Sequence, residues 1–307
     1  MKIIRSPHAM TLWSDRLRRE GVTIGFVPTM GALHDGHRAL LRAARLRCDA
    51  LVVSIFVNPT QFGPQEDLSR YPRPITRDHR LCRTEGVDVC FEPTASDMYP
   101  NGFQSSVMVP KLAGRWEGAA RPHHFEGVAT VLVKLFSIVR PHHTVFGQKD
   151  FQQAALVRRL IADLNLAIDL KVHPTVREPD GLAMSSRNIY LSPDHRRRAP
   201  VLYRALSAGR QAILNGVRDG RRIERIMRQV MAEDRTVRPE YLAVCDAGSL
   251  DTLTTVAGSA VLLGAARIGL VRLIDNVTVA VPPARPNRKH SRIRVTRVTR
   301  SSSDWSD

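Results

Sequence analysis

Short apolar runs alternate with longer amphipathic stretches through the first 177 residues of the chain. The runs have the length of buried strands, whereas the longer stretches place apolar residues at helical spacing. The predicted strands are residues 23–28, 51–57, 88–92, 144–146 and 168–173. The predicted helices are residues 35–48, 75–86, 126–140 and 150–164. This alternation predicts an α/β fold, a Rossmann-like parallel sheet with helices on both faces.

The pattern changes near Pro179. Helices are predicted at residues 193–215 and 220–235, and short strands at residues 240–245, 260–267, 270–274 and 277–281. We therefore expect a smaller α+β domain over residues 178–281, following a Rossmann-like domain over residues 1–177. The last segment, residues 282–307, is rich in Pro, Arg and Ser with few large apolar residues, and this composition predicts a disordered basic tail.

Composition narrows the class of protein. Hydrophobic residues make up 43% of the chain, enough for a sizeable core. The sequence has no apolar run of about 18 residues that would predict a membrane span, and its start lacks the apolar core of a signal peptide. The four cysteines show no paired metal spacing and are too few for a disulfide framework. We therefore expect reduced thiols, no metal-ligand cluster and a cytoplasmic location.

The formal net charge of +17 favours anionic partners, either nucleotides or nucleic acid. Twelve arginines and four acidic residues lie between Arg196 and Arg238, and these also fit a solvated basic surface. Aromatic residues are not interleaved with the basic ones, which disfavours nucleic-acid binding as the primary role. Weak binding of nucleic acid by the tail stays open as a side property.

One segment carries the strongest chemical signal. The predicted strand at residues 23–28 runs into Thr29-Met30-Gly31-Ala32-Leu33 and then His34-Asp35-Gly36-His37, where a helix is expected to begin. The first N–H groups of a helix have no internal partner and bind anions, and imidazole rings beside them can donate to phosphate oxygens. The segment predicts a phosphate site. Two surface histidines at a helix start are the alternative.

Four further polar segments follow predicted strands or a loop. Asn58-Pro59-Thr60-Gln61 supplies carboxamides suited to a hydroxy acid, and Arg121-Pro122-His123-His124 precedes an apolar helix. Gly147-Gln148-Lys149-Asp150, with Gln153 one turn later, places a point charge for phosphate at a strand end. Met184-Ser185-Ser186-Arg187 combines hydroxyls with a guanidinium, a combination suited to polyphosphate. A mobile loop of this type can close over a nucleotide.

These five segments, in this order, resemble the pantoate–β-alanine ligase (pantothenate synthetase) family of the His-x-Gly-His nucleotidyltransferases. The resemblance spans residues 3–281 and includes Asp275-Asn276 near its end. It implies ATP-dependent condensation of (R)-pantoate with β-alanine through pantoyl adenylate, with release of AMP and pyrophosphate. It also implies Mg²⁺ as a companion of ATP, a homodimer, a nucleotide- and pantoate-binding first domain and a lid formed by the smaller domain.

The resemblance also implies roles for individual residues. His34, His37 and Lys149 would be catalytic, Gln61 and Gln153 would hold pantoate, and Gln61 would also serve β-alanine. No residue is assigned as a metal ligand, and His124 is expected only as a pocket wall. The ATP-binding residues would be Met30, Gly31, Ala32, Leu33, His34, Asp35, Gly36, His37, Gly147, Gln148, Lys149, Asp150, Val176, Met184, Ser185, Ser186 and Arg187.

The chain departs from the family pattern at three places. Thr60 stands where Met is common beside the pantoate pocket, Gln148 stands where Glu is common, and the basic tail lies outside the pattern. Another nucleotidyltransferase of the superfamily is the competing enzyme class. It would share the histidine segment and the Ser-Ser-Arg loop but not the paired glutamines Gln61 and Gln153.

Overall fold

A parallel sheet of six strands forms the first half of the computed structural model, which describes residues 1–64 and 66–281. The predicted tail over residues 282–307 lies outside the described residues. The strand order is β1-β4-β3-β2-β5-β6, and every neighbouring pair is parallel. The strands are β1 (Lys2–Ile4), β2 (Ile24–Thr29), β3 (Ala50–Ile55), β4 (Val89–Phe91), β5 (His143–Gly147) and β6 (Asp169–His173).

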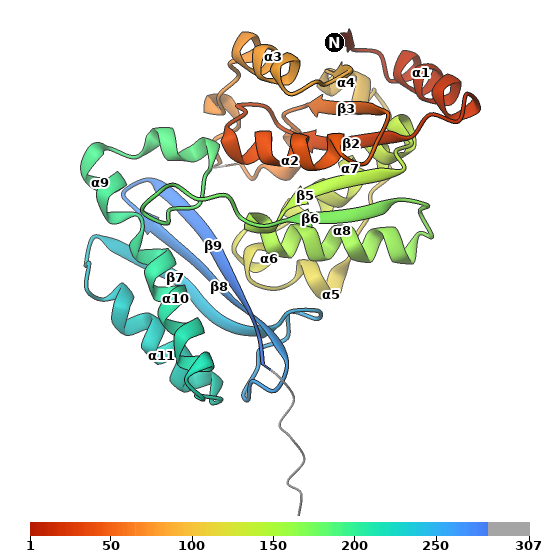
Figure 1. Ribbon diagram of the computed structural model, residues 1–307. Coiled ribbons are helices and arrows are strands. Elements are labelled where there is room, and N and C mark those ends of the chain that lie inside the picture. The colour runs from red at the N-terminus through yellow and green to blue at the C-terminus, as the bar shows by residue number, and fades with distance from the viewer. Residues whose placement is uncertain (65, 282–307) are drawn as a thin grey trace, which may run out of the picture.

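Helices cover both faces of this sheet (Figure 1). They are α1 (Pro7–Arg19), α2 (Asp35–Arg45), α3 (Ile75–Thr84), α7 (His124–Val139) and α8 (Phe151–Asp163), with the short α4 (Ala95–Met98), α5 (Pro110–Ala113) and α6 (Glu117–Ala120). Successive strand residues point to opposite faces. Phe26 accordingly packs with Phe136 of α7 in one core, whereas Val27 packs with Leu41 of α2 in another. Both cores confirm the predicted Rossmann-like arrangement.

An antiparallel sheet forms the second half. Its strands are β7 (Val237–Asp246), β8 (Ser259–Ile268) and β9 (Val271–Ala280), accompanied by α9 (Pro193–Arg198), α10 (Val201–Leu214) and α11 (Gly220–Met231). Leu262 of β8 packs with Leu206 of α10 and Met227 of α11. Its neighbour Leu263 faces the opposite side and packs in a cluster with Ala155 of α8. The second sheet is therefore held between its own helices and the first half of the molecule.

Two element predictions were wrong. Residues 270–274 and 277–281 form a single strand, β9, because Asp275 and Asn276 are buried and hydrogen-bonded, although their polarity suggested a break. Residues 193–215 form two helices that separate at Ala199-Pro200. Proline has no N–H to continue a helical ladder, so a new helix begins after it. The domain boundary near residue 177 stays a prediction.

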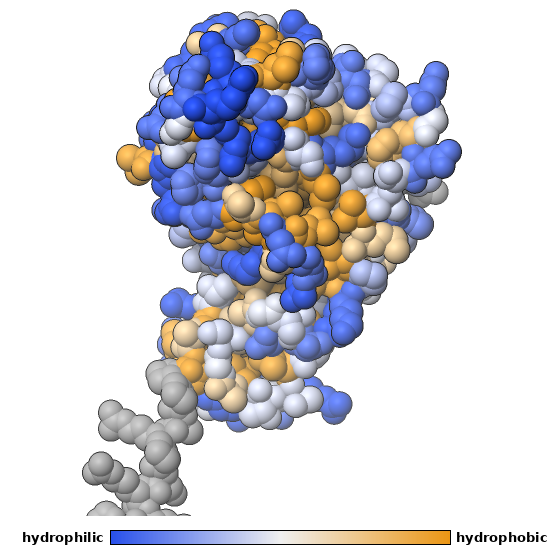
Figure 2. Space-filling view, turned by 90° about the vertical axis from the view of Figure 1, so that its right-hand side faces the viewer, coloured by the Kyte–Doolittle hydropathy of each residue, from blue (hydrophilic) through white to orange (hydrophobic). Residues whose placement is uncertain are grey.

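The surface also carries structural information. Figure 2 shows apolar side chains gathered across the middle of one face, over the half of the molecule that contains the parallel sheet. Within residues 1–64 and 66–281, no helix is long and apolar enough to cross a membrane.

Candidate active site

The turn between β2 and α2 is held from the outside by Asp78 of α3. Gly31 and Ala32 both adopt positive φ angles, 83° and 51°. The Asp78 carboxylate accepts from the N–H groups of Ala32 and Leu33, each at 2.8 Å. Burial raises the pKa of Asp78 even though these donors oppose the shift. Sequence reasoning missed Asp78, because nothing in the chain marks an aspartate 45 residues away as the partner of this turn.

His34 and His37 meet at the start of α2, with ring centroids 4.1 Å apart. The Nδ1 atom of His34 accepts from the Gly36 N–H at 3.1 Å, and the Nδ1 atom of His37 faces the His34 N–H at 3.3 Å. With Nδ1 as the acceptor, the proton of a neutral ring is on Nε2. Each ring can therefore present an Nε2–H donor to a bound group.

Both histidines are uncharged at neutral pH. Burial, followed by the nearby Lys149 charge, lowers the pKa of His34 to about 4. Burial, followed by His34, lowers the pKa of His37 to about 3. This compact arrangement requires glycine at position 36, because a Cβ atom there would lie 2.8 Å from the His34 ring.

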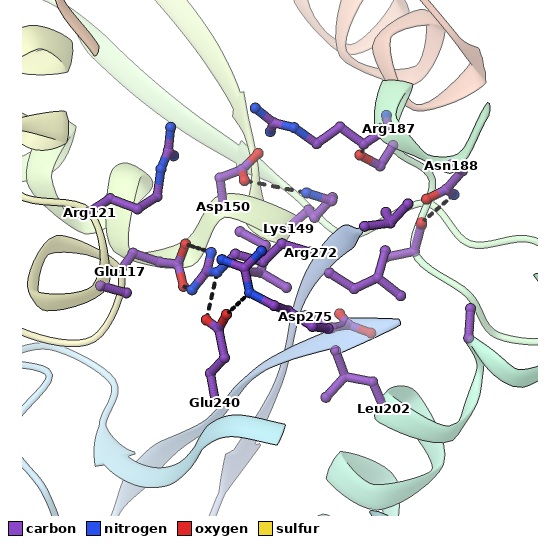
Figure 3. A pocket seen from close by; sticks show the side chains of 18 of the residues that line it. Glu117, Arg121, Lys149, Asp150, Arg187, Asn188, Leu202, Glu240, Arg272 and Asp275 are labelled. Carbon is purple, nitrogen blue, oxygen red and sulfur yellow. Dashed lines mark hydrogen bonds and ion pairs between the residues drawn. The ribbon is translucent and has the colours of Figure 1, made fainter. Parts of the chain in front are cut away.

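A cavity of about 1170 Å³ lies beside this turn, between the two sheets (Figure 3). Lys149 and Asp150, which follow β5, project into it, with the Lys149 ammonium 3.4 Å from the Asp150 carboxylate. Burial would raise the pKa of Asp150, but Lys149 overcomes this effect and the pKa lies below its usual range. Gln153 and Arg187 also line the cavity.

Some of the predicted ATP-binding residues line one of two hollows, whereas others, His37 among them, line neither. Lys149, Asp150 and Arg187 line the large cavity, whereas His34, Asp35 and Met184 line a more open cleft of about 620 Å³. Ser185 lines both, so the loop that carries it forms a wall shared by the two hollows. A ligand that bridges the Ser185 loop would contact both groups.

Gln61 is fixed before any substrate binds. Its side chain accepts from Asn58 Nδ2 at 3.2 Å, and its Nε2 atom lies 2.9 Å from the sulfur of Met30. The hydroxyl of Thr60 donates to Asn58 Oδ1 at 3.0 Å, so this departure from the family pattern satisfies a neighbour's carbonyl. Gly127 permits the close approach of α7, since a Cβ atom there would lie 2.4 Å from the Thr60 oxygen. Gln153 lines the large cavity, whereas Gln61 is buried and lines neither hollow.

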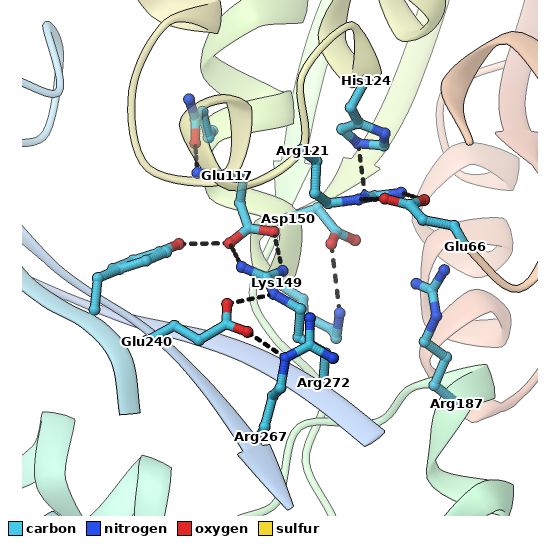
Figure 4. A network of polar contacts seen from close by, with 12 residues as sticks. Glu66, Glu117, Arg121, His124, Lys149, Asp150, Arg187, Glu240, Arg267 and Arg272 are labelled. Atoms are coloured by element: carbon cyan, nitrogen blue, oxygen red, sulfur yellow. Dashed lines mark hydrogen bonds and ion pairs between the residues drawn. The ribbon is translucent and has the colours of Figure 1, made fainter. Parts of the chain in front are cut away.

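Arg121 and His124 form one wall of the cavity (Figure 4). The Arg121 guanidinium pairs with Glu66, with N–O distances of 2.7 and 2.5 Å. His124 Nδ1 lies 2.8 Å from the Gln61 carbonyl, and its Nε2 faces Arg121 at 3.1 Å. Burial, followed by Arg121, lowers the pKa of His124 to about 4, so a neutral ring holds the main chain at Gln61.

Arg187 is paired in this structure. Its guanidinium donates twice to the Asp67 carboxylate, at 3.1 Å each, and the adjacent Ser186 hydroxyl lies 3.3 Å from the Tyr71 hydroxyl. The predicted polyphosphate clamp is therefore docked on the segment around residues 67–71. The pair engages the Nε and Nη2 atoms of Arg187.

The second sheet positions the strand-end residues of the first. Asn276 of β9 donates to the carbonyl oxygens of Gln148 and Lys149, at 2.8 and 2.9 Å. Gln148 Nε2 donates back to Asn276 Oδ1 at 3.2 Å. Val176, one of the predicted ATP-binding residues, has its carbonyl occupied by the Met184 N–H at 3.0 Å.

A buried ion-pair network also joins the two halves and was not foreseen from the sequence. Arg272 of β9 donates twice to Glu117 of α6, at 2.5 and 2.7 Å, and once to Glu240 at 2.7 Å (Figure 4). The Tyr241 hydroxyl donates to Glu117 at 2.7 Å. Glu117 and Arg272 are 155 residues apart, so local pattern gives no signal of their contact.

The fold and site define a class of nucleotide-binding α/β enzyme, with an N–H-rich turn and a lysine at the carboxyl ends of parallel strands. The family model for pantoate–β-alanine ligase matches residues 2–278. The chain belongs to this family, whose members are ligases for pantoate and β-alanine.

Individual relatives agree with this assignment. A pantothenate synthetase from Heliobacterium modesticaldum is 50% identical over 281 residues, covering 92% of this chain and 100% of the relative. One from Acidobacterium capsulatum is 53% identical over 262 residues, covering 85% and 88%. The solved pantothenate synthetase from Thermus thermophilus superposes with a TM-score of 0.86 at 44% identity, covering 90% of this chain and 99% of the other.

A pantoate–β-alanine ligase from Francisella tularensis, solved in complex with β,γ ATP and β-alanine, superposes with a TM-score of 0.73 at 32% identity. The alignment covers 90% of this chain and 97% of that one.

Proposed function

We propose that this chain joins pantoate to β-alanine in two steps, in which ATP first converts pantoate to pantoyl adenylate with release of pyrophosphate. The amine of β-alanine then attacks the acyl carbon and releases AMP. The observation that carries this proposal is the neutral pair His34 and His37, placed at a helix start and within electrostatic reach of Lys149. Such a site supplies donors to a phosphate while adding only one full positive charge.

The first step needs alignment and charge stabilisation rather than a protein nucleophile. The pantoate carboxylate attacks the α-phosphorus in line with the departing pyrophosphate. The Nε2–H groups of His34 and His37 and the Lys149 ammonium then stabilise the charge that develops on the phosphate oxygens. Ser185, Ser186 and Arg187 would hold the β- and γ-phosphates after Arg187 leaves Asp67.

The paired glutamines would orient the acid. Gln153 projects into the large cavity and can donate to the pantoate hydroxyls or carboxylate. Gln61, already fixed by Asn58, loses little side-chain entropy on binding and would serve both pantoate and β-alanine.

The residues present also fit Mg²⁺. This ion is usually bound through one or two carboxylates together with substrate phosphates, and it keeps several waters. Asp150 offers one ionised carboxylate in the cavity next to the phosphate-binding lysine. Bound there with ATP, Mg²⁺ would neutralise charge on the phosphates, while Asp150 stays in contact with the Lys149 ammonium.

A homodimer in the cytoplasm is part of the proposal. The apolar face in Figure 2 is the kind of surface that a second copy would cover. Free cysteines at positions 48, 82, 90 and 245 fit a reducing compartment. Sedimentation equilibrium that returns the monomer mass at micromolar concentration would contradict the dimer.

Weak nucleic-acid binding by residues 282–307 is a separate proposal, supported by seven basic and two acidic residues in this segment. Removal of the segment should abolish salt-sensitive retention on DNA, and unchanged retention would exclude the segment as its cause.

The reaction is tested by incubating the full chain with ATP, Mg²⁺ and D-pantoate, with and without β-alanine. We expect AMP and an equal amount of pantothenate, identified by mass, only when both substrates are present. ATP cleavage that depends on neither substrate, or AMP formation with another carboxylic acid alone, would favour a different nucleotidyltransferase.

A further inference from the structure

A cluster of three different metal-binding side chains lies where α3 meets the end of β4, and none of the three lines either hollow. The ligand atoms of His79, Cys90 and Glu92 all lie within 4.8 Å of one another. Cys90 is fully buried, and the side chains of His79 and Glu92 are only 14% and 11% exposed. We propose that these three residues bind a thiophilic divalent cation such as Zn²⁺, which goes beyond the proposed ligase function.

Secondary structure places the residues of each element on one face, and the packing of α3 beside β4 brings the two faces together. Residues two apart on an extended segment share a face, so Cys90 of β4 and Glu92 immediately after it point the same way. Residues three apart on a helix are also neighbours, which places Cys82 on the same face of α3 as His79. Cys82 is fully buried beside Cys90 but does not belong to the cluster of three.

The donor set selects the class of cation. Thiolate, imidazole and carboxylate are the ligands of tetrahedral zinc, whereas Mg²⁺ and Ca²⁺ prefer oxygen alone. One thiolate and one carboxylate supply two negative charges for a dication. His79 already contacts the Glu92 carboxylate, so a cation can insert where these two groups and Cys90 converge.

The positive charge of Arg5 opposes cation binding at this cluster but does not prevent it. The Arg5 guanidinium lies 3.8 Å from Glu92. Its side chain is 67% exposed, so it can move into solvent when a cation neutralises Glu92. The small exposed fractions of His79 and Glu92 mark the side from which the cation enters.

Metal binding at this site would affect the turn between β2 and α2, because His79 is adjacent in sequence to the residue that holds that turn. Asp78, which holds the N–H groups of Ala32 and Leu33, directly precedes His79 on α3. A cation that binds His79 to β4 would fix this part of α3 and therefore the carboxylate that shapes the turn. The cluster itself lines neither the large cavity nor the smaller cleft.

The test uses the full chain kept reduced with a phosphine, with Co²⁺ as a spectroscopic probe and Zn²⁺ as its competitor. We expect one Co²⁺ per chain, a thiolate-to-cobalt charge-transfer band and displacement by Zn²⁺. Cys90→Ser should abolish the band, and Glu92→Gln should weaken Zn²⁺ binding by at least about tenfold. Cys245→Ser is the matched control, since Cys245 is equally buried but belongs to the second sheet.

Two results would overturn the proposal. One is Co²⁺ binding without a thiolate band in the wild-type chain. The other is equal Zn²⁺ affinity in the wild type and in folded Glu92→Gln and His79→Gln variants, which would place the bound metal elsewhere. Circular dichroism of each variant establishes folding, and the two polar substitutions provide the test if Cys90→Ser does not fold.

Discussion

The two sheets contribute to the site in different ways. The first half contains short, buried polar anchors, such as Asp78 of α3 and Asn58 after β3, which hold backbone N–H groups and a glutamine in fixed positions. The antiparallel sheet instead reaches across with Asn276 and Arg272, which hold Lys149 and Glu117 from outside. In the proposed mechanism the first half presents His34, His37 and Lys149, and Asn276 of the second half holds the main chain at Lys149.

Because the two sheets contribute differently, substitutions in them should have different effects: some should lower the reaction rate, and others should destabilise the contact between the sheets. A substitution at the end of a parallel strand should lower the reaction rate of a molecule that stays folded. A substitution in the contact between the sheets should destabilise the packing of the second sheet against the first half, and with it the wall of the large cavity. The following predictions test that separation.

The largest effect is expected at the phosphate site. His37→Ala or Lys149→Ala should lower the rate of pantoyl adenylate formation by about 10²–10³, as expected when one transition-state donor is removed. Single-turnover measurement with ATP and pantoate isolates this step. Gln153→Ala is the control within the cavity and should mainly weaken pantoate use, with ATP binding nearly intact. Near-normal adenylate formation in the His37 or Lys149 variant would contradict the assigned roles.

The second-largest effect is expected on stability, at the Glu117–Arg272 ion pair between the two halves. Glu117→Ala removes the bidentate partner of Arg272, whose side chain is 16% exposed. Removal of one member of a buried pair costs about 3–5 kcal/mol, and we expect about 1–3 kcal/mol here because Glu240 still pairs with Arg272. Urea unfolding measures the difference. Glu224→Ala removes an exposed pair on α11 and should cost less than about 1 kcal/mol, so equal losses would contradict a docking role for Glu117.

The same contrast explains what the sequence could predict. Periodicity located most of the strands and helices, and motif order brought out the histidine turn and Lys149, since these depend on neighbours along the chain. Periodicity did not reveal the short strand β1 or the helix α1, and it did not show that β9 continues through Asp275. Asp275 is stable in a buried strand because Arg177 pairs with it at 2.6 Å, a contact between residues 98 positions apart. Local sequence pattern also failed to predict the contacts of Asp78, of Glu117 and of the Arg187–Asp67 pair, because their partners are distant along the chain.

Acid should destabilise the histidine turn more than the rest of the molecule. In the unfolded chain both imidazoles bind protons below their ordinary pKa of about 6.5, whereas burial lowers the folded-state pKa of His34 to about 4 and of His37 to about 3. Protons therefore bind the unfolded chain preferentially, and the free energy of unfolding falls as pH is lowered from about 6.5 to 4.

Urea midpoints at pH 7, 6 and 5 measure this loss. Carboxylates in ion pairs contribute acid lability in both proteins, so the informative quantity is the difference between the wild type and a His34→Gln/His37→Gln variant. The variant should lose less stability on acidification. Parallel losses in the two proteins would show that the histidines are already protonated in the folded state.

The smallest effect is expected where the loop of the second half meets the first. Asp67→Asn weakens the pair that occupies Arg187, whose side chain and that of Asp67 are 32% and 20% exposed. A partly exposed pair contributes about 0.2–1 kcal/mol, so the KM for ATP should fall by about 1.5- to 5-fold with little change in kcat. Asp163→Asn, which weakens an exposed pair on α8, should leave both constants unchanged. A higher KM for ATP in Asp67→Asn would mean that the carboxylate orients Arg187 for the phosphates. Arg187 would then belong with the pre-set anchors of the parallel sheet, and the loop would not need to release it before ATP binds.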